Sequence, residues 1–177
     1  TLSAAMRFPD VTDVIEAEED RDAVAALARE AALRAVTAMK RMRAGEGERL
    51  CNDLLNRVTT VESIAGKIDV RAPFVVEEYR TKLSERIESM LGGVEVDRTR
   101  LATEVALFAD KASINEELVR LASHITEMRK VLGADEAAGR RLDFIVQEMN
   151  REFNTIGSKA NDAEITSLVI AGKGEIE

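Results

Sequence analysis

The sequence is poor in residues that break helices and in residues that build large aromatic cores. It contains no tryptophan, two prolines and ten glycines among 177 residues, and aromatic residues make up 3% of it. Its single cysteine, Cys51, excludes an intramolecular disulfide and fits a reducing compartment. No stretch approaches the ~18 consecutive apolar residues that a membrane-spanning helix needs, and we find no signal-peptide pattern. We therefore expect a cytoplasmic protein that does not enter a membrane.

The sequence also lacks the short motifs of several catalytic chemistries. It contains no HExxH, no pair of CxxC motifs, no Walker A loop and no GxGxxG, so zinc–thiolate and nucleotide-loop chemistry are not expected. His124 is the only histidine, and any histidine-based acid–base step or metal ligation within one chain must use it. A lone histidine is more often structural. Nucleophilic systems are weakly supported, because Ser123 is adjacent to His124 and points away from it on a helix.

Acidic residues outnumber basic ones, and the formal net charge is −8. This balance argues against a surface covered with nucleic-acid-binding charge, so any such contact must come from local patches. Residues 31–45 form one such patch, with Arg34, Lys40, Arg41 and Arg43 and no acid. The patch has two interpretations. It is either a solvated face paired with acids on a neighbouring element, or a surface that binds a phosphate backbone.

Alanine, leucine, glutamate and arginine dominate the composition, as in mostly helical proteins. We predict a mainly α fold, with a long antiparallel helical hairpin followed by a C-terminal helical bundle. Residues 1–19 are expected to be the tail of a missing N-terminal domain, 20–92 the hairpin arm and 93–177 the C-terminal helical domain. Gly45 and Gly47 predict a bend or break in the first helix, and Pro73 predicts its end.

Residues 137–156 predict a helix with an unusual polar face. Its apolar positions recur at helical spacing, and Asp143, Gln147, Asn150 and Asn154 follow one another at intervals of four, three and four beside them. Aligned amides are poorer helix formers than Lys and Glu but are well suited to directed hydrogen bonds. The pattern therefore indicates a helix that holds something polar.

Acidic residues are frequent in the same part of the chain, and several lie beside apolar stripes. In an earlier helix, Glu117 also shares one side with Arg120 and His124. Carboxylates that converge at the rim of a helical bundle either pair with cations such as Arg140, Arg141, Arg151 or Lys159, or hold a hard divalent cation. Spacing alone favours ion pairs, and both outcomes remain open for Glu104, Asp110, Glu117, Asp143, Glu148 and Glu152.

Two long blocks resemble signatures of the YicC-like family of bacterial stress-associated proteins. They are residues 104–124, EVALFADKASINEELVRLASH, and residues 139–162, GRRLDFIVQEMNREFNTIGSKAND. The resemblance is good over residues 97–170 and looser over residues 8–92. It departs from the family pattern at Gly172 and Gly174, where helix-favouring residues are usual.

The resemblance implies an endoribonuclease that needs a divalent metal, Mn or Mg, and assembles as a ring-like homo-oligomer, with a hexamer suspected. His124, Glu148 and Glu152 are the expected catalytic residues, and the six carboxylates named above are the expected metal ligands. RNA, presented unpaired, would contact Arg140, Arg141, Gln147, Asn150, Arg151, Asn154, Lys159, Lys40 and Arg41. The alternative is a non-catalytic helical adaptor or RNA-binding oligomer in which the carboxylates form structural ion pairs.

Overall fold

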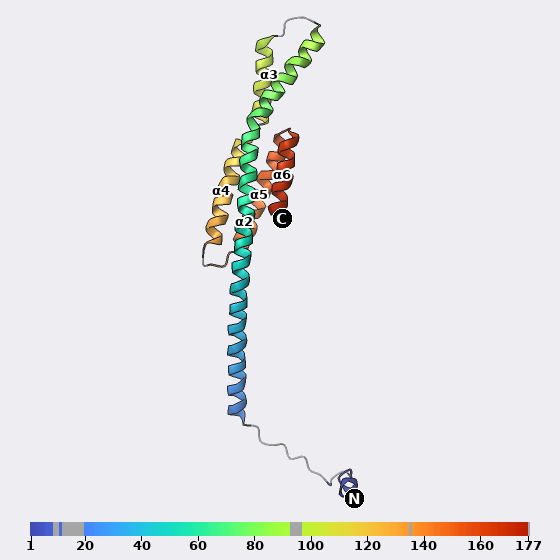
Figure 1. Cartoon of the computed structure of the whole chain (residues 1–177), viewed down its shortest axis with the longest axis vertical. Helices are drawn as coiled ribbons and strands as arrows, with labels where there is room; N and C mark the ends of the chain where they lie inside the picture. Colours follow the sequence, from blue (N-terminus) through green and yellow to red (C-terminus); the bar gives the residue numbers. More distant parts are fainter. Residues whose placement is uncertain (9–10, 12–19, 93–96, 135, 177) are drawn as a thin grey trace. The chain divides into compact units, whose positions relative to one another are not determined.

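The computed structural model describes residues 1–8, 11, 20–92, 97–134 and 136–176 (Figure 1). Over these residues the regular structure is helical and contains no strand, which confirms the prediction of a mainly α fold. None of the described helices is long and apolar enough to cross a membrane. The helices are α1 (Leu2–Ala5), α2 (Arg21–Leu91), α3 (Arg98–Lys111), α4 (Asn115–Leu132), α5 (Gly139–Lys159) and α6 (Ala163–Ile176).

The prediction that the first helix ends near Pro73 is wrong, since α2 continues through this residue, and also through Gly45 and Gly47. Proline lacks the amide hydrogen of an interior helical bond and costs about 3 kcal/mol there. Its neighbours on α2 offset this cost, because Ile68 is completely buried and Val75 is 8% exposed. Burying such side chains stabilises a fold by about 1.5–3 kcal/mol each.

The turn of the hairpin therefore lies beyond Leu91, and its second arm is α3 rather than the residues after Pro73. The rings of Tyr79 on α2 and Phe108 on α3 stack with centroids 3.8 Å apart and planes 9° from parallel. Asp97 begins α3 by accepting hydrogen bonds from the backbone amides of Thr99 and Arg100. These contacts join the two arms and define where the second one starts.

The chain divides into two compact units, Thr1–Glu48 and Arg49–Glu177. The hydrophobic core lies in the second unit, where α4, α5 and α6 pack beside α2 (Figure 1). α5 has the predicted apolar stripe and begins and ends two to three residues later than expected. Its most buried members in the core are Ile145, Met149, Phe153 and Ile156.

The first unit consists mainly of exposed helix. Its described residues are all exposed except Gly45, which is partly buried, and large apolar side chains such as Val24, Leu27 and Met42 face solvent. In the basic patch, Arg34 pairs with Glu30 on the same helix at 2.5 Å. Lys40, Arg41 and Arg43 form no ion pair with any described residue.

Close packing requires glycine at position 172. It is buried in α6, and a Cβ atom built at this position would lie 2.5 Å from Cζ of Phe153. Phe153 is itself completely buried and lies among the core residues of α5. The ring of Phe153 therefore occupies the volume that any larger residue at position 172 would need.

We expect Gly172→Ala to destabilise the fold by about 1–3 kcal/mol, because the added methyl group overpacks the core against Phe153. Gly174→Ala is the matched control, since a Cβ there meets nothing within 4 Å. The control should be neutral or stabilising by less than about 1 kcal/mol. Urea unfolding followed by circular dichroism measures both changes, and equal effects of the two substitutions would contradict this explanation.

Candidate functional site

Two almost fully buried carboxylates lie where α4 and α5 pack against each other. Glu117 on α4 is 2% exposed and Glu152 on α5 is 4% exposed. The helices run antiparallel, since Glu117 near the start of α4 contacts Lys159 at the end of α5, and Glu127 near the end of α4 contacts Arg141 at the start of α5. This arrangement places Glu117 of the first signature block and Glu152 of the second along a single seam.

Arg120 joins the two buried carboxylates. Its Nε donates to Oε1 of Glu152 at 2.9 Å, and its Nη2 donates to Oε1 of Glu117 at 3.2 Å. Its Nη1 donates to the exposed Glu116, and Nζ of Lys159 donates to Oε1 of Glu117 at 2.9 Å. Two cations thus balance the two buried acids.

The second oxygen of each buried carboxylate is left without a partner. Oε2 of Glu117 and Oε2 of Glu152 are both buried and accept no hydrogen bond from the described residues. A buried acceptor without a donor is unfavourable, and such a group in a native fold calls for an explanation. Each of these oxygens could act as a ligand of a hard divalent cation or accept a hydrogen bond from a protonated substrate group.

Glu117 remains ionised in spite of its burial. Burial by itself raises the pKa of this carboxyl, but the hydrogen bond from Lys159 and the charges of Lys159 and Arg120 oppose it, and the pKa lies below its usual value. The folded state therefore binds this proton more weakly than the unfolded chain does. Glu117 stabilises the fold above the pKa of an unfolded glutamate, ~4.3, and this contribution is lost as the pH falls through the lower folded-state pKa.

The antiparallel register places His124 at the level of Glu148, between the Arg120–Glu152 and Arg141–Glu127 ion pairs. Both side chains are half-buried. Glu148 contacts Arg151 at 3.9 Å, and no hydrogen bond or ion pair joins His124 to any described residue. The three predicted catalytic residues, His124, Glu148 and Glu152, therefore come from the same seam.

The structure does not gather all six predicted metal ligands. Glu104 and Asp110 are exposed on α3 and Asp143 is exposed on α5, whereas Glu117 and Glu152 are buried. Within the described part of the chain, no three His, Cys, Asp or Glu side chains are grouped so as to hold a metal ion. Glu117 and Glu152 are the pair brought together, and they meet through Arg120.

The residues predicted to bind RNA divide into two sets. Arg140, Gln147, Arg151 and Asn154 are exposed on α5, and Asn154 accepts a hydrogen bond from Lys173 at 2.8 Å. The others are engaged or lie in another unit. Arg141 pairs with Glu127, Lys159 pairs with Glu117, Oδ1 of Asn150 is buried without a partner, and Lys40 and Arg41 lie in the first unit.

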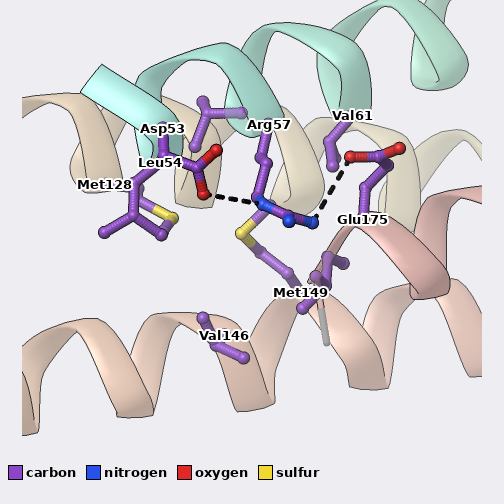
Figure 2. Close-up of a pocket in the computed structure, with 10 residues that line it drawn as sticks. Asp53, Leu54, Arg57, Val61, Met128, Val146, Met149 and Glu175 are labelled. Carbon is purple, nitrogen blue, oxygen red and sulfur yellow. Dashed lines mark hydrogen bonds and ion pairs between the residues drawn. The ribbon is translucent and has the colours of Figure 1, made fainter. Parts of the chain in front are cut away.

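A separate cavity of about 270 Å³ lies between α2, α4, α5 and α6. Arg57 reaches across it, with its Nε 3.0 Å from Asp53 and its Nη1 3.7 Å from Glu175 (Figure 2). Apolar side chains, among them Met128 and Met149, form much of its wall. None of the predicted site residues lines this cavity, so it is distinct from the α4–α5 seam.

From the sequence, Arg120 is expected on the same side of a helix as Glu117 and His124, but no function was predicted for it. The available signal was its spacing, three residues after one acid and four before the only histidine. The spacing cannot show that Glu152, 32 positions later, would contact the same guanidinium. That contact depends on how α4 and α5 pack.

Comparison with known proteins gives a consistent result. Residues 68–177 match the family model described as "Endoribonuclease YicC-like, C-terminal". The chain is 42% identical over 97% of its length to "Probable endoribonuclease YicC" of Clostridioides difficile and 33% identical over 99% of its length to the protein of the same name from Haemophilus influenzae. It spans 59% and 60% of the length of these two relatives.

We expect Arg120→Met to destabilise the fold by about 3 kcal/mol, because it removes a shared partner from two buried charges. Methionine retains much of the apolar stem, so the loss reports on charge rather than on packing. Arg34→Met is the control, since Arg34 belongs to an exposed pair on a single helix whose loss costs less than about 1 kcal/mol. Denaturant unfolding measures both, and an unchanged midpoint for Arg120→Met would contradict the proposed role.

Proposed function

Because the chain belongs to the YicC-like endoribonuclease family, we propose that it cleaves single-stranded or loop RNA with the help of a divalent metal ion, as part of a ring-like homo-oligomer of six copies. The observation that carries this proposal is the contrast between two faces of α5. One face places Glu152 in the buried seam with α4, and another exposes Arg140, Gln147, Arg151 and Asn154. The buried face with its carboxylate is suited to catalysis, and the exposed face with its arginines and amides is suited to binding a polyanion.

The exposed face of α5 would bind the RNA. Its arginines would neutralise phosphates, and its amides would hydrogen-bond to sugars or to base edges that are accessible only in unpaired RNA. RNA bound there would run along α5, the helix that also carries Glu148 and Glu152. The exposed amides, which can bind base edges accessible only in unpaired RNA, are the structural argument for single-stranded or loop substrates.

The buried carboxylates would hold the metal ion. Magnesium usually binds through one or two protein carboxylates together with water and substrate phosphate. Glu117 and Glu152 fit this requirement, because each has one oxygen without a partner among the described residues. When bound, such an ion would activate water or stabilise the charge that develops on the scissile phosphate.

His124 would act as the general acid or base of the reaction. It is the only histidine, it lies at the level of Glu148, and its ring forms no hydrogen bond or ion pair with the described part of the chain. A half-buried imidazole without a fixed partner is free to exchange a proton with a bound substrate. Glu148 would orient the ring or accept its proton.

We expect the purified chain to cleave unstructured RNA with Mn²⁺ or Mg²⁺ and to lose this activity in EDTA. His124→Ala should slow cleavage by about 10²-fold or more, the usual contribution of a general acid or base. Glu152→Gln should lower the rate at saturating metal, and gel analysis of labelled RNA measures all three effects. Val119→Ala, on an exposed position of α4, is the control that should leave the rate unchanged.

Two results would contradict parts of this proposal. Cleavage that is unaffected by EDTA and by Glu152→Gln would overturn the metal assignment. RNA binding that weakens with salt in the absence of any cleavage would favour the second candidate, an RNA-binding or adaptor oligomer without catalysis. A specific observation supports that alternative, because Arg120 and Lys159 already pair with the buried carboxylates.

Assembly would resolve the charge problem posed by an acidic chain that binds RNA. A net charge of −8 repels a polyanion unless basic residues are concentrated on one surface, which a shared interior of several copies would provide. The first unit offers a contact surface, since Val24, Leu27 and Met42 recur along one face of its exposed helix. Exposed apolar faces of this kind are typical of interfaces between copies.

We expect the chain to have a solution mass several times 19.5 kDa. The double substitution Leu27→Glu and Met42→Glu should lower that mass by placing charges in an apolar contact. Light scattering coupled to gel filtration measures it. Val119→Glu, equally exposed on α4, serves as the control, and a mass that does not respond to the double substitution would exclude this helix as the interface.

A further inference from the structure

Phe144 is an exposed aromatic residue on a helix whose other large apolar side chains are buried or partly buried. Its side chain is 59% exposed, while its neighbours on α5, Ile145 and Met149, are 3% and 1% exposed. A ring with this exposure gains less burial energy than the core residues beside it. Its position therefore suggests a contact outside the described chain.

The neighbours of Phe144 along the exposed face are two arginines and two amides, together with the exposed carboxylate of Asp143. Arg140 precedes it by four residues, Gln147 follows by three and Arg151 by seven, so they lie on one face of the helix. Asn154 continues the line three residues after Arg151. All of these residues are exposed, and the line has one residue for each helical turn, with a pitch of about 5.4 Å.

The two arginines in this line are available for a new partner. Arg140 forms no ion pair with any residue the structure describes. Among the described residues, the one ion pair of Arg151 is with Glu148 on its own helix, at 3.9 Å, and its side chain is 76% exposed. Two accessible guanidinium groups on either side of an exposed ring form the combination that binds single-stranded nucleic acid, in which bases stack and phosphates pair.

Phe74 offers a comparison because it is 57% exposed but has a different environment. It lines a groove of about 530 Å³ between α2 and α6, next to Lys67 and Arg71. Arg71 is already bound to Glu78 at 2.6 Å, Asp162 at 2.8 Å and Glu164 at 3.3 Å. Arg71 is therefore already paired and Glu164 adds a negative charge to the lining, which disfavours a phosphate there, so exposure of a ring alone does not define an RNA site.

We propose that Phe144 stacks on an unpaired base of bound RNA, within a binding line formed by Arg140, Phe144, Gln147, Arg151 and Asn154. This inference rests on the proposed function, because it names the contact by which the RNA is held. The arginines bind phosphates on either side of the stacked base, and the amides of Gln147 and Asn154 bind its neighbours. Stacking on a ring tolerates any base, so Phe144 contributes affinity and selects unpaired RNA without selecting a sequence.

The absence of tryptophan allows a direct test of stacking. In Phe144→Trp the new residue is the only tryptophan, and its fluorescence should be quenched when a 2′-O-methyl RNA 12-mer without base pairing is added. Phe74→Trp is the matched control, with an equally exposed ring, and its fluorescence should not change. The 2′-O-methyl groups block cleavage by the 2′-hydroxyl, and EDTA in the buffer stops cleavage by a metal-activated water, so binding is measured independently of activity.

Affinity provides the second measurement. Phe144→Ala should weaken binding of the labelled 12-mer about tenfold in fluorescence anisotropy, within the range known for loss of one base–aromatic stack. Phe144→Tyr should retain most of the affinity, Phe74→Ala should retain all of it, and a fully paired duplex should bind equally to all variants. Circular dichroism and light scattering on the same samples report folding and assembly.

The outcomes separate this inference from the proposed function. Unchanged RNA affinity for Phe144→Ala, or no quenching for Phe144→Trp, overturns the role of Phe144 even if the protein cleaves RNA. A lower solution mass for Phe144→Ala also overturns it, because the ring would then belong to a contact between copies. Quenching and weaker binding without any cleavage support the RNA contact while the proposal of catalysis fails.

Discussion

The balance of charge around Arg120 is the constraint on which this part of the fold depends. Two acids that are almost fully buried, Glu117 and Glu152, would each be strongly unfavourable without a partner. A single guanidinium from α4 donates to both, and Lys159 from the end of α5 adds a second positive charge. The antiparallel register of α4 and α5 is therefore tied to a specific ionic contact as well as to apolar packing.

The faces of α5 differ in chemistry, and the ionic contact with Arg120 lies on one of them. Its apolar stripe packs in the core, its acidic side holds Glu152 in the seam, and its remaining face carries Arg140, Phe144 and Arg151 into solvent. An ion-pair network in the seam balances the charge of the buried acids, so under the proposed function they would repel a bound polyanion less. The proposed RNA binding and the proposed chemistry would then use adjacent sides of one helix.

Much of this could be predicted from the sequence, because helical periodicity depends on local spacing. The buried stripe of α5, the cap at Asp97 and the mainly α fold all follow from residues within a few turns of one another. The prediction that the first helix ends at Pro73 is wrong. Burial of Ile68 and Val75 against helices that are distant in the sequence offsets the cost of proline, and local spacing does not show this burial. The requirement for glycine at position 172 is another example, because it arises from the ring of Phe153, which lies 19 positions earlier in the chain.

By itself, the sequence determined which residue types were available: one histidine, six candidate carboxylates and a line of cations and amides on one helix. Only the tertiary structure decided how they are used. Glu117 and Glu152 meet through Arg120, while Glu104, Asp110 and Asp143 remain exposed on other surfaces. The physical reason is that ion pairing and burial depend on distances across helices, which the spacing of residues along one helix does not contain.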